Sequence, residues 1–178
     1  MIENPENLNM HAIELASQGY FPEAIACFKK AINFDKTNFL LWYNLGITYR
    51  DSGDLESALE SLLNAFLLDE TDEELIETIA TIYHSQGNTD EAFSFCARGL
   101  DINDKNAKFW NLVGVLFFSR TEYSQASTAF ESAVTIDPFY YDALFNLRDT
   151  YNELGNITGT EDCEARMQAI RNKGNINA

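Results

Sequence analysis

The feature that most constrains this chain is a 34-residue period in its small and aromatic residues. One lattice consists of glycines and has Thr121 at its missing point: Gly19, Gly53, Gly87 and Gly155. A second lattice consists of alanines: Ala24, Ala58, Ala92 and Ala126. A third consists of large residues: Leu15, Tyr49, Tyr83, Phe117 and Tyr151. Three residue classes with one period indicate a repeat architecture, in which each unit buries its apolar side against the next.

The period divides the chain into five repeats, and residues are numbered from one to 34 within each. The boundaries are 5–38, 39–72, 73–106, 107–140 and 141–174. In the second repeat, Trp42, Leu45 and Tyr49 have the spacing of one helix face. Gly53 then ends that helix, and Asp54 caps the next one. Each repeat is therefore predicted to form two helices joined by a tight turn.

Single repeats also carry a recognisable motif. In the fourth repeat, Trp110 and Gly114 occupy positions four and eight, and Ala126, Phe130 and Ala133 follow at positions 20, 24 and 27. This pattern resembles that of the tetratricopeptide repeat (TPR) family, W-x2-L-G-x2-Y followed by A-x3-F-x2-A, over residues 5–174. The resemblance implies an all-α fold, a right-handed superhelical α-solenoid of five helix-turn-helix repeats. Residues 1–178 are then a single array whose last repeat is degenerate and caps it.

The two ends depart from the pattern, as expected for capping repeats. Asn4 is predicted to cap the first helix, and His11 at position seven is predicted to pack within the first helix pair. A final helix is predicted over residues 158–172, with Thr158 and Glu161 as a capping box. Its apolar stripe consists of Cys163, Met167 and Ile170. We expect this helix to solvate the end of the array; the alternative is that its weakly apolar face is exposed and docks another subunit.

The charge narrows the class of partner. The formal net charge is −16 and the isoelectric point is about 4.3. Because the twelve Lys and Arg are scattered, the chain has no basic patch for a phosphate backbone, and no nucleic-acid partner is expected. The acidic field favours encounter with basic partners, although it also serves simply to solvate the surface. Without a basic leader or a long apolar run, we expect a cytoplasmic protein that does not contact membranes.

Sequence motifs for catalysis are missing. The chain has no phosphate-binding glycine loop, no G-x-S-x-G and no H-E-x-x-H, and its two histidines lie in different repeats. Its three cysteines are widely spaced without a C-x-x-C pair, which favours a role in packing. We therefore expect neither an enzyme nor a bound cofactor or metal.

The family resemblance implies where a partner binds. In TPR proteins the first helices line a concave groove, mainly through positions two, five, nine, twelve and thirteen. The predicted groove residues are Leu40, Tyr43, Asn44, Ile47, Arg50, Glu74, Glu77, Thr81, His84, Lys108, Asn111, Val115, Phe118, Phe145 and Asp149. Tyr43, Phe118 and Phe145 are expected to be anchors, because the packing pattern does not account for them. The alternative is that they pad neighbouring helices.

The predicted function is a non-catalytic scaffold that binds a basic or amphipathic segment of a protein partner in this groove. A clamp for a free C-terminal carboxylate is not expected, because Glu74 and Thr78 stand where that clamp needs Lys and Arg. Two alternatives stay open. One is a self-assembling module that forms a homo-oligomer, and the other is a TPR module of a larger complex.

Overall fold

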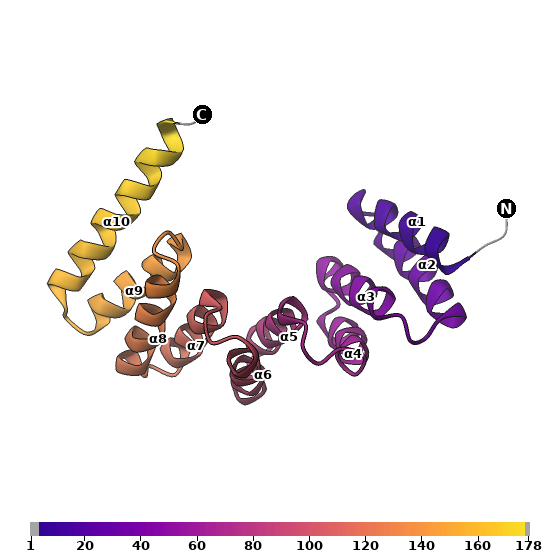
Figure 1. Ribbon diagram of the computed structural model, residues 1–178, viewed down its shortest axis with the longest axis horizontal. Helices are drawn as coiled ribbons and strands as arrows, with labels where there is room; N and C mark the ends of the chain where they lie inside the picture. The colour runs from indigo at the N-terminus through magenta and orange to yellow at the C-terminus, as the bar shows by residue number, and fades with distance from the viewer. Residues whose placement is uncertain (1–3, 177–178) are drawn as a thin grey trace. The chain divides into compact units, whose positions relative to one another are not determined.

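The computed structural model describes residues 4–176, which form ten α-helices and no strand (Figure 1). The predicted all-α fold is therefore confirmed. The first helices of the repeats are α1 (Pro5–Ser17), α3 (Phe39–Ser52), α5 (Glu73–Ser85), α7 (Ala107–Ser119) and α9 (Tyr141–Glu153). The second helices are α2 (Phe21–Phe34), α4 (Leu55–Phe66), α6 (Thr89–Ile102), α8 (Tyr123–Ile136) and α10 (Ile157–Ile176).

Successive first helices begin 34 residues apart, and so do the second helices. The turn inside each hairpin has one residue with positive φ at the same lattice point. Four of these residues are glycines, with φ between 68° and 88°. The fifth is Thr121, with φ of 60°, a conformation that a β-branched residue rarely adopts. The backbone thus keeps the turn geometry even where the glycine is missing.

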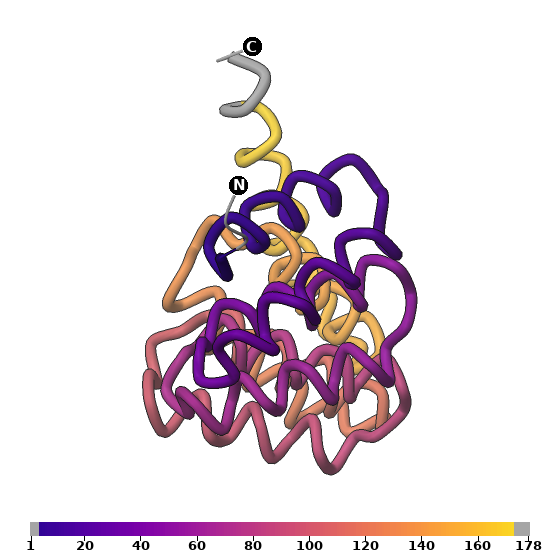
Figure 2. The backbone as a smooth tube through the Cα atoms, turned by 90° about the vertical axis from the view of Figure 1, so that its right-hand side faces the viewer, coloured from indigo at the N-terminus to yellow at the C-terminus, as the bar shows by residue number. Residues whose placement is uncertain are grey.

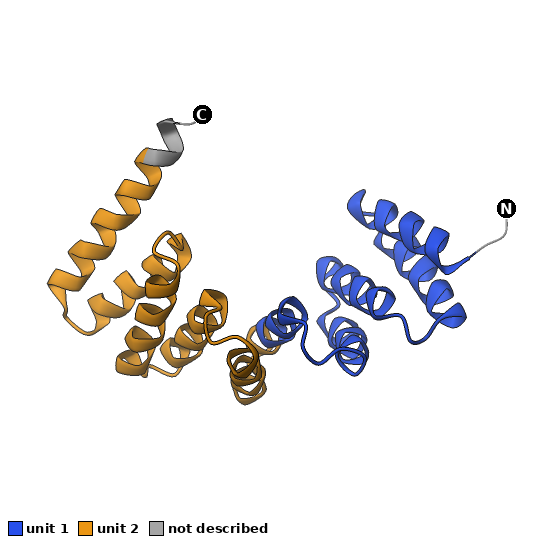
Figure 3. Cartoon of the chain, in the orientation of Figure 1, with its two compact units in different colours: residues 1–82 blue, residues 83–178 orange. Residues whose placement is uncertain are grey.

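The helices form two compact units, residues 1–82 and 83–178, and the boundary falls within α5 (Figure 3). In the first unit α1 packs on α2, α2 on α3, and α3 on α4. The core of this unit consists of Leu8, Ala12, Ala24, Phe28, Ala31, Ile32, Leu41 and Leu45. Asn4 accepts a hydrogen bond from the Asn7 amide and Asp54 accepts one from the Ser57 amide, so both predicted N-caps are confirmed.

The second unit has the same arrangement from α6 to α10. Its core consists of Ala126, Phe130, Ala133, Val134, Ala143, Leu144, Leu147, Cys163 and Met167. Glycine permits two close approaches there. A Cβ atom at Gly114 would lie 2.5 Å from the Phe130 ring within a hairpin. A Cβ atom at Gly99 would lie 2.3 Å from the Phe109 ring, where α6 meets the first helix of the next repeat.

In the second and fourth repeats, the tryptophan at position four forms a hydrogen bond to the loop before its helix. The indole Nε1 of Trp42 donates a hydrogen bond to the Lys36 carbonyl oxygen at 2.8 Å. In the second unit, Trp110 donates in the same way to the Asp104 carbonyl oxygen, also at 2.8 Å. Buried indole N–H groups need such a partner. Tryptophan at this position therefore supplies both apolar area and a polar contact to the preceding loop.

The prediction that His11 packs within the first helix pair is wrong, because His11 is exposed. The equivalent residues Leu45, Ile79 and Leu147 are buried. In the second repeat, Leu45 borders Ile32 of the preceding second helix, so this position faces the preceding hairpin. Within residues 4–176 no hairpin precedes α1, and position seven there stays in solvent.

The predicted capping box at the start of the last helix is also wrong. The helix begins at Ile157, one residue early, and Asn156 caps it by accepting a hydrogen bond from the Gly159 amide at 3.0 Å. The Thr158 side chain therefore lies inside the first turn. The apolar stripe was predicted correctly, because Cys163 and Met167 are buried and Ile170 packs against the same core. This face is covered within the second unit and is not open to another subunit.

Candidate functional site

The predicted groove residues on α3 lie on the face of this helix that points away from its packed side. At about 100° per residue, Leu40, Tyr43 and Ile47 cluster on one side of this helix, roughly opposite Trp42 and Leu45. Leu40 is 57% exposed, and Met10 on α1 is 62% exposed. Both border a pocket of about 230 Å³ whose lining also includes Pro5, Glu6, Asn9, Asp35, Asn38 and Leu41. The sequence prediction missed Met10. This residue occupies position six of the first repeat, and Asn44 was the only residue at position six that was assigned to the groove.

Part of the Tyr43 side chain contacts other residues of the first unit. Its ring stacks on Phe39 with centroids 5.8 Å apart. Its hydroxyl lies close enough to the Glu74 carboxylate on α5 to interact with it electrostatically. Burial raises the pKa of the Tyr43 hydroxyl well above its usual value, and the Glu74 carboxylate adds to this effect. Tyr43 is half-buried, so packing within the unit partly explains why an aromatic residue stands at this position. Tyr43 thus has the Phe39 ring of its own helix and the Glu74 carboxylate of α5 as neighbours.

Asparagine pairs connect neighbouring first helices. The Asn44 amide donates a hydrogen bond to Asn9 Oδ1 at 3.1 Å, which joins α3 to α1. In the second unit the Asn146 amide donates to Asn111 Oδ1 at 3.0 Å, which joins α9 to α7. Both pairs connect position six of one repeat with position five of the repeat before. Such half-buried contacts fix the spacing of the first helices and hold polar atoms at the predicted groove.

Two arginine–aspartate pairs of adjacent residues lie on first helices. Arg50 donates to Asp51 Oδ1 with a shortest distance of 2.8 Å, and Arg148 donates to Asp149 Oδ1 at 2.6 Å. The Arg148 guanidinium also lies 4.1 Å from the centroid of the Phe145 ring. Arg148 therefore covers one face of Phe145, which is still 42% exposed. The charges of the predicted groove residues Arg50 and Asp149 are thus partly neutralised by the adjacent residue in each case.

The predicted groove residues of the second unit meet at a small cavity of about 110 Å³. Its lining consists of Val115 and Phe118 on α7, Phe130 on α8, and Asn146 and Asp149 on α9. The Phe118 ring packs edge-on against Tyr123, with centroids 5.2 Å apart. Phe118 therefore has a packing contact as well as a side that faces the cavity.

The other predicted groove residues vary in accessibility. Arg50, Glu74, Thr81 and Lys108 are exposed. Half-buried are Asn44, Ile47, Glu77, His84, Asn111, Val115, Phe118 and Asp149. None of the fifteen is buried, as a surface role requires. Of these residues, eight lie on α3 and the first part of α5, six lie on α7 and α9, and His84 lies on α5 after the boundary between the units.

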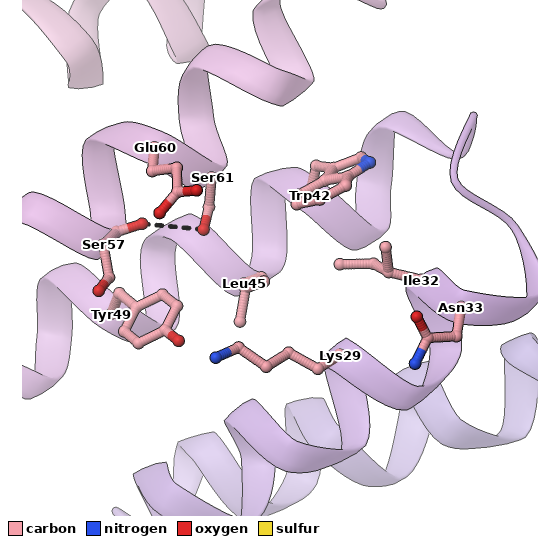
Figure 4. A pocket seen from close by; sticks show the side chains of 9 residues that line it. All are labelled: Lys29, Ile32, Asn33, Trp42, Leu45, Tyr49, Ser57, Glu60 and Ser61. Atoms are coloured by element: carbon pink, nitrogen blue, oxygen red, sulfur yellow. Dashed lines mark hydrogen bonds between the residues drawn. The ribbon is translucent and has the colours of Figure 1, made fainter.

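A larger pocket lies on the opposite side of α3 and was not predicted (Figure 4). It has a volume of about 410 Å³, and its lining consists of Lys29, Ile32, Asn33, Trp42, Leu45, Tyr49, Ser57, Glu60 and Ser61. The Lys29 ammonium lies 5.5 Å from the Tyr49 ring centroid. The second unit has an equivalent pocket of about 420 Å³ beside Trp110 and Phe117. Sequence reasoning assigned these aromatics to packing alone, although polar Lys29 and Glu60 beside them were a signal of incomplete burial.

Comparison with known proteins identifies the family. The profile described as TPR repeat matches residues 14–49, and the profile described as Tetratricopeptide repeat matches residues 40–72 and 74–106. Together these matches cover more than half of the chain. The chain belongs to the tetratricopeptide repeat family. The α-solenoid class of five hairpins is thereby confirmed.

Two curated relatives share only part of their length with this chain. BBSome complex member bbs-4 of Caenorhabditis elegans is 26% identical over 124 residues, which are 70% of this chain and 27% of that protein. BBSome complex member BBS4 of Bos taurus is 27% identical over 130 residues, which are 73% of this chain and 25% of that protein. This TPR chain thus spans about a quarter of the length of these relatives.

A solved structure supports the TPR fold. The crystal structure of MamA protein has a TM-score of 0.84 at 23% identity and covers 97% of this chain and 94% of that chain. TPR proteins mediate protein–protein interactions and complex assembly, and the fold is typically a non-catalytic scaffold. In the described part of the chain, no helix has the length and apolarity needed to cross a membrane.

Proposed function

We propose that this TPR chain is a binding scaffold whose first helices hold a basic, amphipathic segment of a protein partner. The observation that carries this proposal is the combination of exposed apolar side chains and carboxylates on these helices. Leu40 and Met10 are more than half exposed, and Glu6 and Asp35 line the same pocket. Apolar side chains in pockets supply binding energy, and surrounding charges supply specificity and speed of encounter.

Charge on the first unit favours a basic partner. Its first helices, up to residue 82, carry six carboxylates and a single arginine, Arg50. The Arg50 guanidinium is already paired with Asp51. A basic segment would therefore meet an acidic surface with little competing positive charge. Because such attraction is screened by salt, binding should weaken as the ionic strength rises.

Self-assembly through stacked hairpins has less support. Positions three, seven and ten of later repeats bury side chains such as Leu41, Leu45 and Thr48. In the first repeat these positions hold Asn7, His11 and Glu14, which are all exposed. A second copy that stacked there would bury a carboxylate and an imidazole without partners, which is costly. A role as a module of a larger complex agrees with the BBSome complex members among the relatives and is compatible with the proposed binding.

A peptide-display selection on the intact chain tests the proposal. We expect recovered sequences to combine Lys or Arg with aliphatic or aromatic residues. The selected peptide should bind Leu40→Ala or Phe118→Ala about tenfold more weakly than the wild type, as expected for anchor contacts. Leu67→Ala is the matched control, because Leu67 is 75% exposed at the end of a second helix. Equal weakening by the control, or selection of acidic peptides, would overturn the proposal.

A further inference from the structure

The cavity between α7 and α9 has rigid apolar walls. Val115 and Phe118 form one side, and Phe130, which is fully buried, lies beneath them. Gly114 permits this arrangement, because a side chain at that position would clash with the Phe130 ring. Phe118 is held by its edge-on contact with Tyr123. The cavity is therefore formed before any ligand arrives, which lowers the entropic cost of binding.

Two residues that line this cavity, Asn146 and Asp149, each have a side-chain oxygen without a hydrogen-bond partner among the described residues. The Nε and Nη2 atoms of Arg148 both donate to Oδ1 of Asp149, at 2.9 and 2.6 Å, and Oδ2 accepts nothing. Asn146 uses its amide nitrogen to bond Asn111, and its side-chain oxygen accepts nothing. Both residues line the cavity. The lining thus combines apolar side chains with a carboxylate and an amide that each retain one oxygen able to accept a hydrogen bond.

These features suit a side chain with an aliphatic stem and a compact cation at its tip. The volume of about 110 Å³ is smaller than the roughly 150 Å³ of an engineered cavity that holds benzene, so a single flexible chain fits better than a ring. An arginine fork prefers both oxygens of a carboxylate, and here Arg148 already uses one of them. A lysine ammonium is a point charge with three donors, which one oxygen from each of Asp149 and Asn146 can share.

We propose that this cavity is the anchor site for a lysine side chain of the bound partner segment. The lysine stem packs on Val115 and Phe118, and the ammonium donates hydrogen bonds to Oδ2 of Asp149 and to the side-chain oxygen of Asn146. The proposal rests on the proposed function, because it specifies one residue of the segment that the first helices hold. In this proposal, Asp149 determines that the cavity selects lysine over an uncharged side chain, although its other oxygen is already paired with Arg148.

The test uses small probes, so it does not depend on knowing the partner. N-acetyl-lysine methylamide and its norleucine analogue, which lacks the ammonium, are titrated into the intact chain while the methyl resonances of Val115 are followed by NMR. We expect the lysine probe to shift these resonances and to bind about fivefold more tightly than the norleucine probe. Asp149→Asn should abolish this difference.

Asp51→Asn is the matched control, since it removes the same charge from the other arginine–aspartate pair and leaves the cavity intact. This variant should bind both probes as the wild type does. Equal binding of the two probes, shifts that miss Val115, or an equal loss in Asp51→Asn would overturn the lysine site. If the peptide selection still yields peptides that depend on Leu40 and Phe118, only the lysine site fails and the proposed function stands.

Discussion

Replacing Gly99 by alanine tests whether successive repeats pack as closely as the structure shows. In an open helix this change stabilises by about 1 kcal/mol, because alanine is the better helix former. Here the new Cβ atom would lie 2.3 Å from Cζ of Phe109, a ring that is fully buried. Overpacking of this kind costs about 1–3 kcal/mol. The clash should therefore exceed the gain, and Gly99→Ala should lower the free energy of unfolding by about 1 kcal/mol.

A compensating change makes this prediction sharper. Phe109→Leu removes the ring atoms nearest the new methyl group, so the clash should disappear. In that background Gly99→Ala should become neutral or stabilising, and the double-mutant cycle should give a coupling of about 1–3 kcal/mol. Guanidinium unfolding followed by circular dichroism measures all four variants. Stabilisation of the wild type by Gly99→Ala would refute the reasoning, since it would mean that α6 and α7 do not meet at this glycine.

Three further predictions concern the turns, the end of the array and the thiols. Thr121→Gly should raise the free energy of unfolding by about 1 kcal/mol, because relief of left-handed strain outweighs the greater entropy of unfolded glycine; a loss of stability would contradict this. Replacing Asn7, His11 and Glu14 together by leucine should produce concentration-dependent association in sedimentation velocity. An unchanged monomer fraction would count against the argument that these polar residues prevent a second copy from stacking on the first repeat. Burial, with a smaller effect of Asp162, raises the pKa of the Cys163 thiol to about 11, so at pH 8 only about one thiol in a thousand is ionised. Cys163 should therefore react with iodoacetamide far more slowly than half-buried Cys27, and alkylation should accelerate as the pH rises toward 11; equal rates at pH 8 would be the contrary result.

The repeat architecture could be predicted because its determinants are local and periodic. Glycine at the turn and tryptophan at position four act within one hairpin or on the adjacent loop, so a single sequence displays them. His11 was misplaced because the pattern assigns a residue to a position but does not reveal what covers that position. Thr158 was misplaced because Thr158 and Asn156 are both good N-caps, and the turn geometry at Gly155 selects Asn156.

The candidate site could be predicted only in outline. Helical spacing identified the exposed side of the first helices, and the accessibility of Leu40 and Phe145 agrees with it. Contacts between side chains could not be foreseen. The closeness of Tyr43 to Glu74 depends on the distance between two helices, and the use of a single Asp149 oxygen by Arg148 depends on side-chain rotamers. These contacts decide how much of each residue is free to bind, which a residue list does not show.

Site-specific photo-crosslinking tests the central claim most directly. p-Benzoylphenylalanine is introduced in place of Leu40 or Phe145 on first helices. The comparison positions are Leu67, which directly follows α4, and Ile157 at the start of α10, which are 75% and 72% exposed. The chain is then irradiated with the display-selected peptide. The account predicts crosslinks from positions 40 and 145 that disappear with excess unlabelled peptide, and none from positions 67 and 157. Crosslinks from 67 or 157 alone would contradict it, because the partner would then bind away from the first helices.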